Sequence, residues 1–277
     1  MDPVGQAIWY IESHFNGDIS LDDIADAGGV SRYYLSRAFG TVTGHSAMRY
    51  VRGRRLTEAA RLLAAGAADI LSVALEAGYG SHEAFTRAFR EQFGTTPESV
   101  RAQRHLDNLA LLEPFKMEDA PIVTLEPPRF LNGKALLIAG LSERYSFEAC
   151  AAIPSQWQRF TPHIGNLPGQ SGRAAYGVKL NGDDTGFDYV TGVEVAAFDG
   201  IPKEMARLRI APRRYAVFRH LGHVATIRGT HNAIWSKWLP DSGHQVADAP
   251  DFERYGEDFD AKRGTGGIEI WIPLEGG

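Results

Sequence analysis

The sequence is poor in cysteine and in long apolar runs, and its first part is poor in lysine. One of the 277 residues is a cysteine, Cys150, so no disulfide can form within the chain, as is typical of a reducing cytoplasm. No apolar run approaches the roughly 18 residues that span a bilayer, and the N-terminus lacks the basic and apolar segments of a secretory signal. We therefore expect a cytoplasmic protein without a membrane segment.

The motifs of common enzymes are missing as well. No glycine-rich phosphate loop follows a strand pattern, and no Gly-x-Ser-x-Gly nucleophile elbow occurs. His220 and His223 are close in sequence, but no third ligand follows at a metal-binding spacing. The sequence thus predicts no metal, no cofactor, no catalytic residue and no enzyme, although for the C-terminal half the last point stays open.

The clearest feature that is present is a repeat with a period of fifty residues. The aligned pieces are 24–28 with 74–78, 31–39 with 81–89, and Gly44 with Gly94. Each copy consists of a short helix, a glycine turn and a serine-capped helix, which is the pattern of a helix-turn-helix. Two such units in one chain can do on DNA what a dimer of single units does. The repeat predicts a sequence-specific DNA-binding protein.

Helical periodicity and cap residues predict the remaining helices of this half. We expect a first helix from Pro3 to Asn16-Gly17, a long helix from Ser46 to about Ala65, and a last helix after Pro97. Twenty residues at about 1.5 Å each span roughly 30 Å. That is close to the roughly 34 Å between successive major-groove faces of DNA, so the long helix would hold two reading helices about one turn apart.

Charge gives a mixed signal. The chain carries a net charge of −5, and residues 1–105 hold 11 arginines against 12 acidic residues, whereas nucleic-acid-binding domains are usually basic. Before Lys116 every cation except histidine is an arginine, and five of them lie between Arg49 and Arg61. The bidentate guanidinium suits phosphate and guanine. A solvated helix face would show the same arginines, so both interpretations stay open.

The second copy of the repeat resembles the signature of the AraC/XylS family of transcription regulators. The pieces that carry the resemblance are Ala77-Gly78-Tyr79-Gly80-Ser81, Phe85-Thr86-Arg87-Ala88-Phe89-Arg90 and Phe93-Gly94-Thr95-Thr96-Pro97. It covers roughly residues 5–104. By position it implies DNA contacts from Arg32, Tyr33, Ser36 and Arg37 in the first reading helix, and from His82, Glu83 and Arg87 in the second.

Two departures from the Rob-like members of this family concern the reading helices. Those members place a tryptophan where Tyr33 stands and glutamines near His82 and Glu83. A carboxylate at Glu83 would accept a hydrogen bond from a cytosine amine and would repel phosphate. We therefore expect two unlike half-sites, which one chain can occupy alone.

Prolines mark the end of this half. Pro114, Pro121 and Pro127-Pro128 break helices and favour extended backbone. We expect a DNA-binding domain at residues 1–106, a linker at 107–121 and a second domain at 122–277.

The second domain contains a weaker duplication. Residues 153–160 resemble 232–238, and Gly192–Val195 resembles Gly267–Ile270. Each copy has the pattern strand, helix, strand, strand, which predicts an antiparallel sheet with two helices against it. The expected fold class is an all-α double helix-turn-helix domain followed by a duplicated antiparallel α+β ligand-binding domain.

Two acidic residues in this duplication could form a binding site. Glu269 alternates with isoleucines and shares a strand face with Trp271, and Glu194 lies between two valines in the same way. A carboxylate beside aromatic rings in a concave site attracts an organic cation. An acid on a solvent-exposed strand face fits the same pattern.

This half resembles the GyrI-like ligand-binding domain over about residues 122–275. The resemblance lies in Asp188–Val195, Ile210–Phe218, Ile234–Pro240 and Asp251–Tyr255. It implies a pocket lined by an acid on the last strand, here Glu269, and by aromatics. The candidate pocket walls are Phe147, Tyr176, Tyr189, Phe218, Trp235 and Trp271, of which Phe218 and Trp235 would equally suit a plain core.

Together the two halves predict a transcription regulator that binds promoter DNA and senses a small hydrophobic or cationic effector. RNA polymerase is a further candidate partner, and we expect a monomer or weak dimer. Two alternatives concern the C-terminal domain. It could hydrolyse reactive electrophiles, with Glu269, helped by Glu253 or a tyrosine, activating water, or it could inhibit another protein, as gyrase-binding members of the GyrI-like family do.

Overall fold

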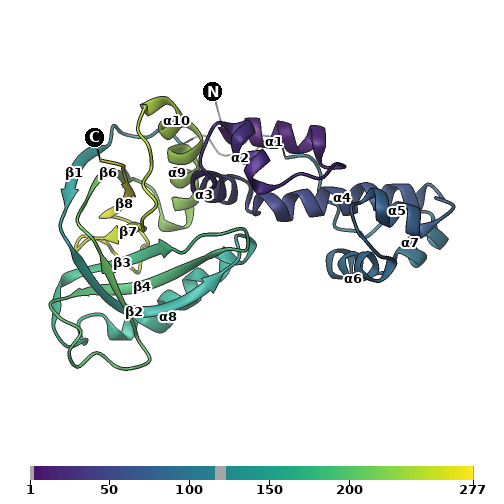
Figure 1. Cartoon of the computed structure of the whole chain (residues 1–277). Coiled ribbons are helices and arrows are strands. Elements are labelled where there is room, and N and C mark those ends of the chain that lie inside the picture. Colours follow the sequence, from purple (N-terminus) through teal and green to yellow (C-terminus); the bar gives the residue numbers. More distant parts are fainter. Residues whose placement is uncertain (1–2, 116–122, 277) are drawn as a thin grey trace.

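Helices form the first part of the molecule and a large sheet forms the second (Figure 1). The computed structural model describes residues 3–115 and 123–276. The last part of the expected linker, residues 116–121, therefore lies outside the described residues. Among the described residues no helix is long and apolar enough to cross a membrane. The helices before residue 104 are α1 (Pro3–His14), α2 (Leu21–Gly28), α3 (Arg32–Thr43), α4 (Ala47–Ala64), α5 (Ile70–Glu76), α6 (His82–Phe93) and α7 (Pro97–Gln103).

The helix boundaries follow the predicted caps. The side chains of Ser31, Ser46 and Ser81 each accept a hydrogen bond from a backbone N–H in the first turn of α3, α4 and α6. Gly44 and Gly94 take the left-handed conformation at the ends of α3 and α6. The double helix-turn-helix is therefore confirmed, with α2–α3 and α5–α6 as its two units.

The long helix α4 connects the two units and carries the second one away from the sheet (Figure 1). The second unit has its own core, built on Leu56, Phe85 and Phe89. Near the middle of α4, the buried guanidinium of Arg54 donates to both carboxylate oxygens of Glu12 in α1 and to the carbonyl of Leu112. Arg54 thus ties α4 to the first helix and to the chain that follows α7.

The second part is one antiparallel sheet of eight strands among the described residues, in the order β1-β6-β8-β7-β3-β4-β2-β5. The strands are β1 (Arg129–Gly133), β2 (Leu136–Tyr145), β3 (Gln170–Leu180), β4 (Phe187–Val195), β5 (Ala206–Ile210), β6 (Arg213–His220), β7 (Asp251–Tyr255) and β8 (Ile268–Pro273). The two copies contribute β2-β4-β3 and β6-β8-β7, which meet where β3 pairs with β7. The predicted duplicated antiparallel α+β fold is confirmed.

Two further strands exchange partners between the copies. β1 precedes the first copy but pairs with β6 of the second, and β5 precedes the second copy but pairs with β2 of the first. Each short strand therefore covers the outer edge of the other copy, which leaves no long strand as a free edge.

Helices cover one face of this sheet and leave the other open. The covering helices are α8 (Ile153–Phe160), α9 (Ile227–Ala233), the π-helix η5 (Ile234–Trp238) and α10 (Leu239–Ser242), with short 3-10 turns η2 (Glu148–Ala152), η3 (Thr161–His163) and η4 (Val224–Thr226) beside them. On β8 the isoleucines are buried under the helices, whereas Glu269 and Trp271 lie half-buried on the other face. The predicted alternation of this strand is confirmed.

The contacts of Arg54 predict a large loss of stability when it is removed. Arg54→Ala should lower the free energy of unfolding by roughly 3 kcal/mol, because it leaves a partly buried carboxylate and a buried carbonyl without their donor. Arg52→Ala, on the same helix, removes an exposed ion pair with Glu91 and should cost at most about 1 kcal/mol. Urea denaturation of both variants measures the difference, and equal losses would show that Arg54 does not hold α4 in this way.

Candidate DNA interface and ligand sites

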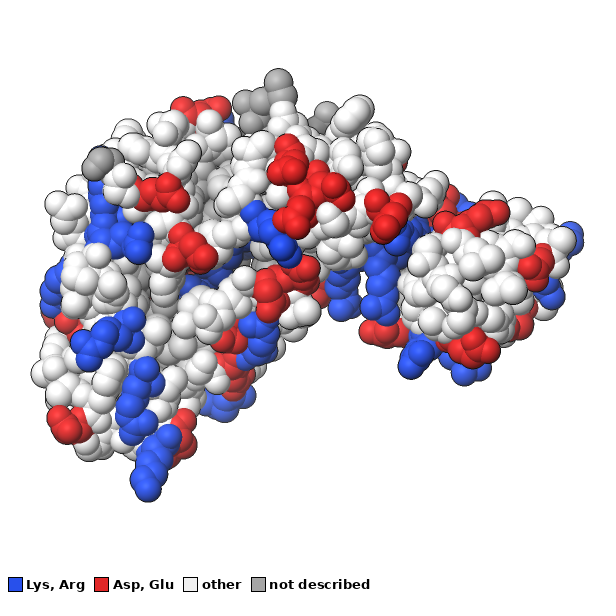
Figure 2. All heavy atoms as spheres, viewed as in Figure 1, with Lys and Arg blue, Asp and Glu red and all other residues white. Residues whose placement is uncertain are grey.

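The second reading helix, α6, is open to solvent. Glu83 and Arg87 are exposed, and among the described residues Arg87 has no ion-pair partner. His82, at the first position of α6, lies 3.0 Å from Glu98 of α7. Figure 2 shows basic side chains, with acidic ones between them, along the lower edge of this unit, on the side where α6 lies in Figure 1. The three residues predicted to contact DNA from α6 thus lie together at the surface.

The first reading helix, α3, is instead buried against the C-terminal domain. It packs on α9 and η5. Ser36 and Arg37 are only 5% and 4% exposed. The Arg37 guanidinium forms an ion pair with Asp251 at the start of β7 and donates to the carbonyl of Lys179 at 3.4 Å. Arg32 remains at the surface, 3.3 Å from Asp22.

Two tyrosines of α3 extend this polar contact. The hydroxyl of Tyr33 donates to the carbonyl of Ala249 at 2.8 Å, and that of Tyr34 donates to the carbonyl of Trp235 at 2.6 Å. At the far end of α3, Glu148 lies 3.0 Å from the His45 ring and 3.1 Å from Arg49. In this structure, two of the four residues predicted to contact DNA from α3, Tyr33 and Arg37, bind the chain's own second domain, and a third, Ser36, is buried.

The apolar side of the contact is one continuous core. Residues of α1–α4 share a hydrophobic cluster with Phe218, Trp235 and the isoleucines of β8. Phe147 packs on α3 at Gly40, where an added Cβ would collide with its ring. Phe147, Phe218 and Trp235, which we expected in a ligand pocket, therefore belong to the interface between the domains.

The arginines of α4 are occupied within the chain. Arg49 binds Glu148, Arg52 binds Glu91, and Arg55 donates to the carbonyls of Phe15 and Gly17. Arg54 and Arg61 are likewise paired with carboxylates. The dense arginine set therefore holds helices together, and its weight as evidence for phosphate contacts falls.

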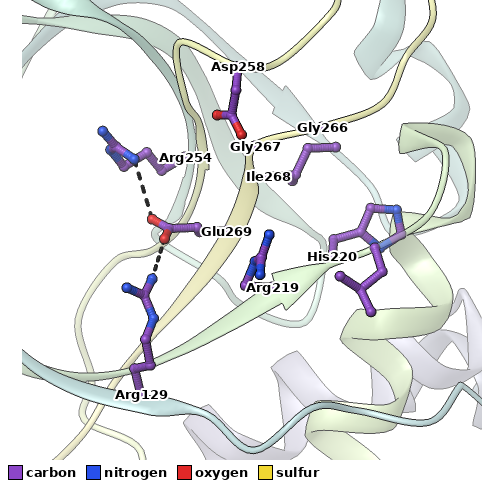
Figure 3. Close-up of a pocket in the computed structure, with 10 residues that line it drawn as sticks. Arg129, Arg219, His220, Arg254, Asp258, Gly266, Gly267, Ile268 and Glu269 are labelled. Atoms are coloured by element: carbon purple, nitrogen blue, oxygen red, sulfur yellow. Dashed lines mark hydrogen bonds and ion pairs between the residues drawn. The ribbon is translucent and has the colours of Figure 1, made fainter.

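The open face of the sheet contains a cavity of about 460 Å³ beside Glu269. Figure 3 shows the Glu269 carboxylate between two guanidinium groups, those of Arg129 and Arg254. Arg219 of β6, which is the cross-strand neighbour of Glu269, also lines the cavity but has no partner among the described residues. Asp258 and the backbone of Gly266-Gly267 complete the charged and polar lining. The cavity therefore holds three arginines against two carboxylates.

Three other predicted pocket residues lie on the same face. The indole nitrogen of Trp271 donates to Glu269 at 3.2 Å, and its ring stacks on Phe252. Tyr176 packs against Phe252 as well. Glu194 occupies the position in β4 that Glu269 has in β8, and Lys134 binds it at 2.7 Å. The duplication thus places two equivalent acids on the open face, each neutralised by a cation.

A second acidic site is sealed beneath the helices on the opposite face. Glu253 of β7 is 5% exposed. It accepts hydrogen bonds from the hydroxyls of Tyr189 at 2.9 Å and Tyr255 at 3.0 Å, and it lies 2.9 Å from the His231 ring and 3.3 Å from the Lys179 ammonium. Of the eight predicted ligand residues, Tyr189 is the one that belongs to this cluster.

Burial and charge set the protonation of the cluster. Burial would raise the pKa of Glu253, but Lys179 and His231 outweigh it and hold the pKa of the carboxyl below its usual range. Burial, followed by the charge of Lys179, lowers the pKa of His231 to about 4. Burial and the charge of Glu253 raise the pKa of Tyr189 and Tyr255. At neutral pH the cluster therefore holds an ionised carboxylate, a neutral imidazole and two phenols that donate to it.

Sequence reasoning named Glu253 only as a helper and missed His231, Lys179 and Tyr255. Glu253 alternates with Phe252 and Arg254 in the same way that Glu269 alternates with its neighbours, so the pattern of one strand cannot tell which acid is covered. A weak signal was available, because Asp251, Glu253 and Tyr255 share one face of β7. The groups that surround Glu253 come from β3, β4 and α9, so the pattern of β7 alone does not predict them.

The histidines near the end of β6 serve the fold. His220 lies 2.8 Å from the Thr230 hydroxyl through one ring nitrogen and 3.0 Å from the His223 carbonyl through the other. Among residues 3–115 and 123–276, no three potential metal ligands of the histidine, cysteine or acidic type come together.

The fold and sites define a protein with a double helix-turn-helix joined to a domain that has a cavity of ligand size. A helix-turn-helix family model matches residues 24–103, and the model of the GyrI-like small-molecule-binding domain matches residues 126–275. The chain belongs to the AraC/XylS family of transcription regulators and carries a C-terminal GyrI-like domain.

Similar proteins have this architecture in whole or in part. The transcriptional regulator Rob of Salmonella typhimurium LT2 is 26% identical over 282 residues, which cover 96% of either chain. The regulatory protein SoxS of Escherichia coli K12 is 38% identical over 94 residues, 34% of this chain and 88% of its own. The solved structure of SAV2435 bound to tetraphenylphosphonium covers 55% of this chain and 95% of its own, with a TM-score of 0.47 and 23% identity.

His231 predicts how stability depends on pH. Its pKa in the folded protein, about 4, is below the ordinary 6.5, so below pH 6.5 the unfolded chain takes up a proton that the folded chain does not. The free energy of unfolding should therefore fall as the pH drops from about 6.5 towards 4, by at most about 1.4 kcal/mol per pH unit. Urea denaturation at pH 5, 6 and 7 measures this slope.

A matched pair of variants isolates the source of the slope. His231→Gln removes the buried imidazole and should flatten the dependence between about pH 7 and pH 5, where ordinary carboxyl groups are largely ionised. His105→Gln changes an exposed histidine and should leave the slope as it is. A wild-type slope in His231→Gln would contradict the assignment.

Proposed function

We propose that this chain is a one-component regulator that binds promoter DNA through its double helix-turn-helix and adjusts that binding when a small molecule occupies its C-terminal domain. The observation that carries the proposal is the fusion of the two reading units to a GyrI-like domain that has its own cavity. The expected division, with DNA binding at 1–106, a linker at 107–121 and sensing at 122–277, is part of the proposal. The proposal also includes action in the cytoplasm, RNA polymerase as a further partner, and function as a monomer or weak dimer.

Base contacts from α6 are the first element of the proposal. Arg87 is exposed on the outer face of α6 and has no ion-pair partner within residues 3–115 and 123–276, while Phe85 and Phe89 anchor the opposite face in the core. An arginine fork at such a position binds the two acceptors of guanine. Glu83, one turn earlier, is suited to a cytosine amine, and His82 completes the set. Tyr33, Ser36 and Arg37 would read the other half-site once α3 is accessible.

A ligand in the cavity of the open sheet face is the second element. The sequence predicts a hydrophobic or cationic ligand, because a carboxylate beside aromatic rings attracts an organic cation. Since Arg129 and Arg254 already bind Glu269, a cation would have to displace both. Arg219 offers the same cavity a guanidinium that has no partner in the described part of the chain. We therefore favour a ligand with an acidic group, held by Arg219 and by the backbone of Gly266 and Gly267 beside it.

The two alternatives for the C-terminal domain are not favoured. Rob, which matches this chain over almost its whole length, is a transcriptional regulator, and a module whose task is to inhibit another protein does not need a double helix-turn-helix. Hydrolysis would require Glu269 to act as a base on water, but two guanidinium groups occupy its carboxylate.

Arg87 gives a direct test of base reading. Arg87→Ala should weaken binding to a duplex selected by the full chain from a random pool by about 1–3 kcal/mol and relax the preference at one base pair. Arg87→Lys keeps the charge but loses the fork, so it should retain much of the affinity and still lose the base preference. Electrophoretic shift and repeated selection measure both effects. Unchanged selectivity in both variants would remove α6 from the list of reading helices.

The class of ligand can be tested by thermal unfolding. Salicylate, as an aromatic acid, should raise the Tm of the full chain, and tetraphenylphosphonium should not. A ligand at 100 times its Kd stabilises by about 2.7 kcal/mol, on the order of 5–10 °C for a domain of this size. Arg219→Gln should abolish the rise, whereas Arg209→Gln, exposed on β5 away from the cavity, should not. A shift with the cation alone would restore the cationic class.

A further inference from the structure

The C-terminal domain offers α3 hydrogen-bond acceptors, as the major groove of DNA would. Arg37 meets the carboxylate of Asp251 and the carbonyl of Lys179, and Tyr33 meets the carbonyl of Ala249. All three are acceptors. A guanine edge likewise presents two acceptors to an arginine fork. The groups of α3 that are suited to reading bases are therefore already satisfied within the chain.

Burial makes this contact exclusive. With Arg37 at 4% exposure and Asp251 at 2%, neither water nor a DNA backbone has access to the guanidinium while the domains are together. A guanidinium that is buried against β7 and β3 cannot at the same time bind a base pair. The second reading helix has no such cover, since Arg87 is exposed.

We infer that strands β7 and β3 act as an intramolecular substitute for DNA, so that the free chain is autoinhibited at its first reading helix and reads DNA with α6 alone until α3 is released. This inference rests on the proposed function, because it concerns how the same DNA site is regulated. It assigns Asp251 as the residue that takes the place of the base pair, and Gly40 as the point where α3 fits against Phe147.

The contact of α3 with β7 and β3 is called the lock from here on. The buried acid cluster around Glu253 connects this lock to the rest of the C-terminal domain. Asp251 and Glu253 are on the same face of β7, two residues apart. Lys179 offers its carbonyl to Arg37, while its ammonium lies 3.3 Å from Glu253 and 3.3 Å from the His231 ring. His231 belongs to α9, on which α3 packs. A change in the pairing of Glu253 therefore moves the groups that hold Arg37, which is how the state of the sensor domain reaches the DNA-reading helix.

Release of α3 has a measurable consequence for affinity. When only a fraction of a protein is competent to bind, its apparent Kd is the intrinsic Kd divided by that fraction. A lock that is closed in about 90–99% of molecules therefore weakens binding to a two-half-site duplex by about 10–100-fold. It does not affect a duplex that carries only the half-site of α6.

Two variants open the lock from opposite sides. Gly40→Ala places a methyl group against the Phe147 ring, and alanine favours the helical state of α3 itself, so it weakens docking without harming the reading helix. Asp251→Asn removes the carboxylate that neutralises Arg37. The matched controls are Gly17→Ala, where an added Cβ has only an ordinary contact at 3.4 Å, and Asp188→Asn, which breaks a distant ion pair with Arg144. Arg37 itself is unsuitable because it serves both the lock and DNA.

The experiment uses the full chain and a two-half-site duplex selected from a random pool with the Gly40→Ala chain. A second duplex carries only the half-site whose recognition is lost in Arg87→Ala. Gly40→Ala and Asp251→Asn should bind the first duplex at least tenfold more tightly than the wild type and the controls, and all five proteins should bind the second duplex equally. Thermal unfolding establishes that each variant is folded, and the two opening variants act on different domains, so misfolding of one leaves the other as a test.

Two results would overturn the inference. If Gly40→Ala binds the two-half-site duplex within twofold of the wild type, α3 is not locked in the free chain. If both opening variants gain equally on the two duplexes, the effect is general and not specific to α3. Absence of binding by every protein to every selected duplex would instead refute the proposed function, and the lock with it.

Discussion

The charge of Arg37 sets the arrangement of the molecule. Taking a guanidinium out of water costs several kcal/mol unless a carboxylate and further acceptors surround it, and here Asp251 and the carbonyl of Lys179 supply them. Because those acceptors belong to the sheet, the first helix-turn-helix unit can bury its polar face only by docking on the second domain. The apolar core that runs from α1–α4 into β8 then follows. The first unit is thereby packed against the GyrI-like domain, while α4 carries the second unit free of it (Figure 1).

The sheet gives two similar acids different properties by placing them on opposite faces. Glu253 faces α9 and is sealed among two phenols, an imidazole and an ammonium, which together hold it as a carboxylate. Glu269 faces the cavity, where its two guanidinium partners come from β1 and β7 and are partly exposed. The sealed cluster is suited to transmit a change between strands and α9. The open one is suited to exchange partners with a ligand, because solvent and small molecules reach it.

Local signals predicted much of this fold, and non-local ones did not. Ser31, Ser81, Gly44 and Gly94 encode helix ends in their own backbone conformations, so the repeat revealed the helix-turn-helix units directly. The alternation in β8 likewise predicted which face Glu269 takes. The exchange of β1 and β5 between the copies depends on pairing across long stretches of chain, for which a short strand carries no sequence signal. The pattern of β7 likewise carries no signal for α9, the helix that covers Glu253.

The docking of α3 was out of reach for a related reason. A polar helix face rich in donors has the same sequence whether it is meant for DNA, for solvent or for another part of the chain. Only the acceptors opposite the helix determine which partner it binds, and Asp251, one of these acceptors, is more than 200 positions away from Arg37 in the sequence. Gly40 shows the same limit. A glycine within a helix costs up to about 1 kcal/mol in local stability, and its reason becomes visible only when the ring of Phe147 is seen against it.

The two reading helices are therefore under different constraints. In the proposed mechanism, the residues of α6 have to suit one partner, DNA, and the His82–Glu98 pair fixes the start of the helix against α7. The residues of α3 would have to suit two partners in turn, since Tyr33 and Arg37 would fit both a groove and the acceptors of β7 and β3. A change at Arg37 would then alter the base preference of one half-site and the strength of the lock together, whereas a change at Arg87 would alter base preference alone. On this proposal the asymmetry between the two copies of the repeat follows from geometry, because one copy would carry both recognition and control and the other recognition only.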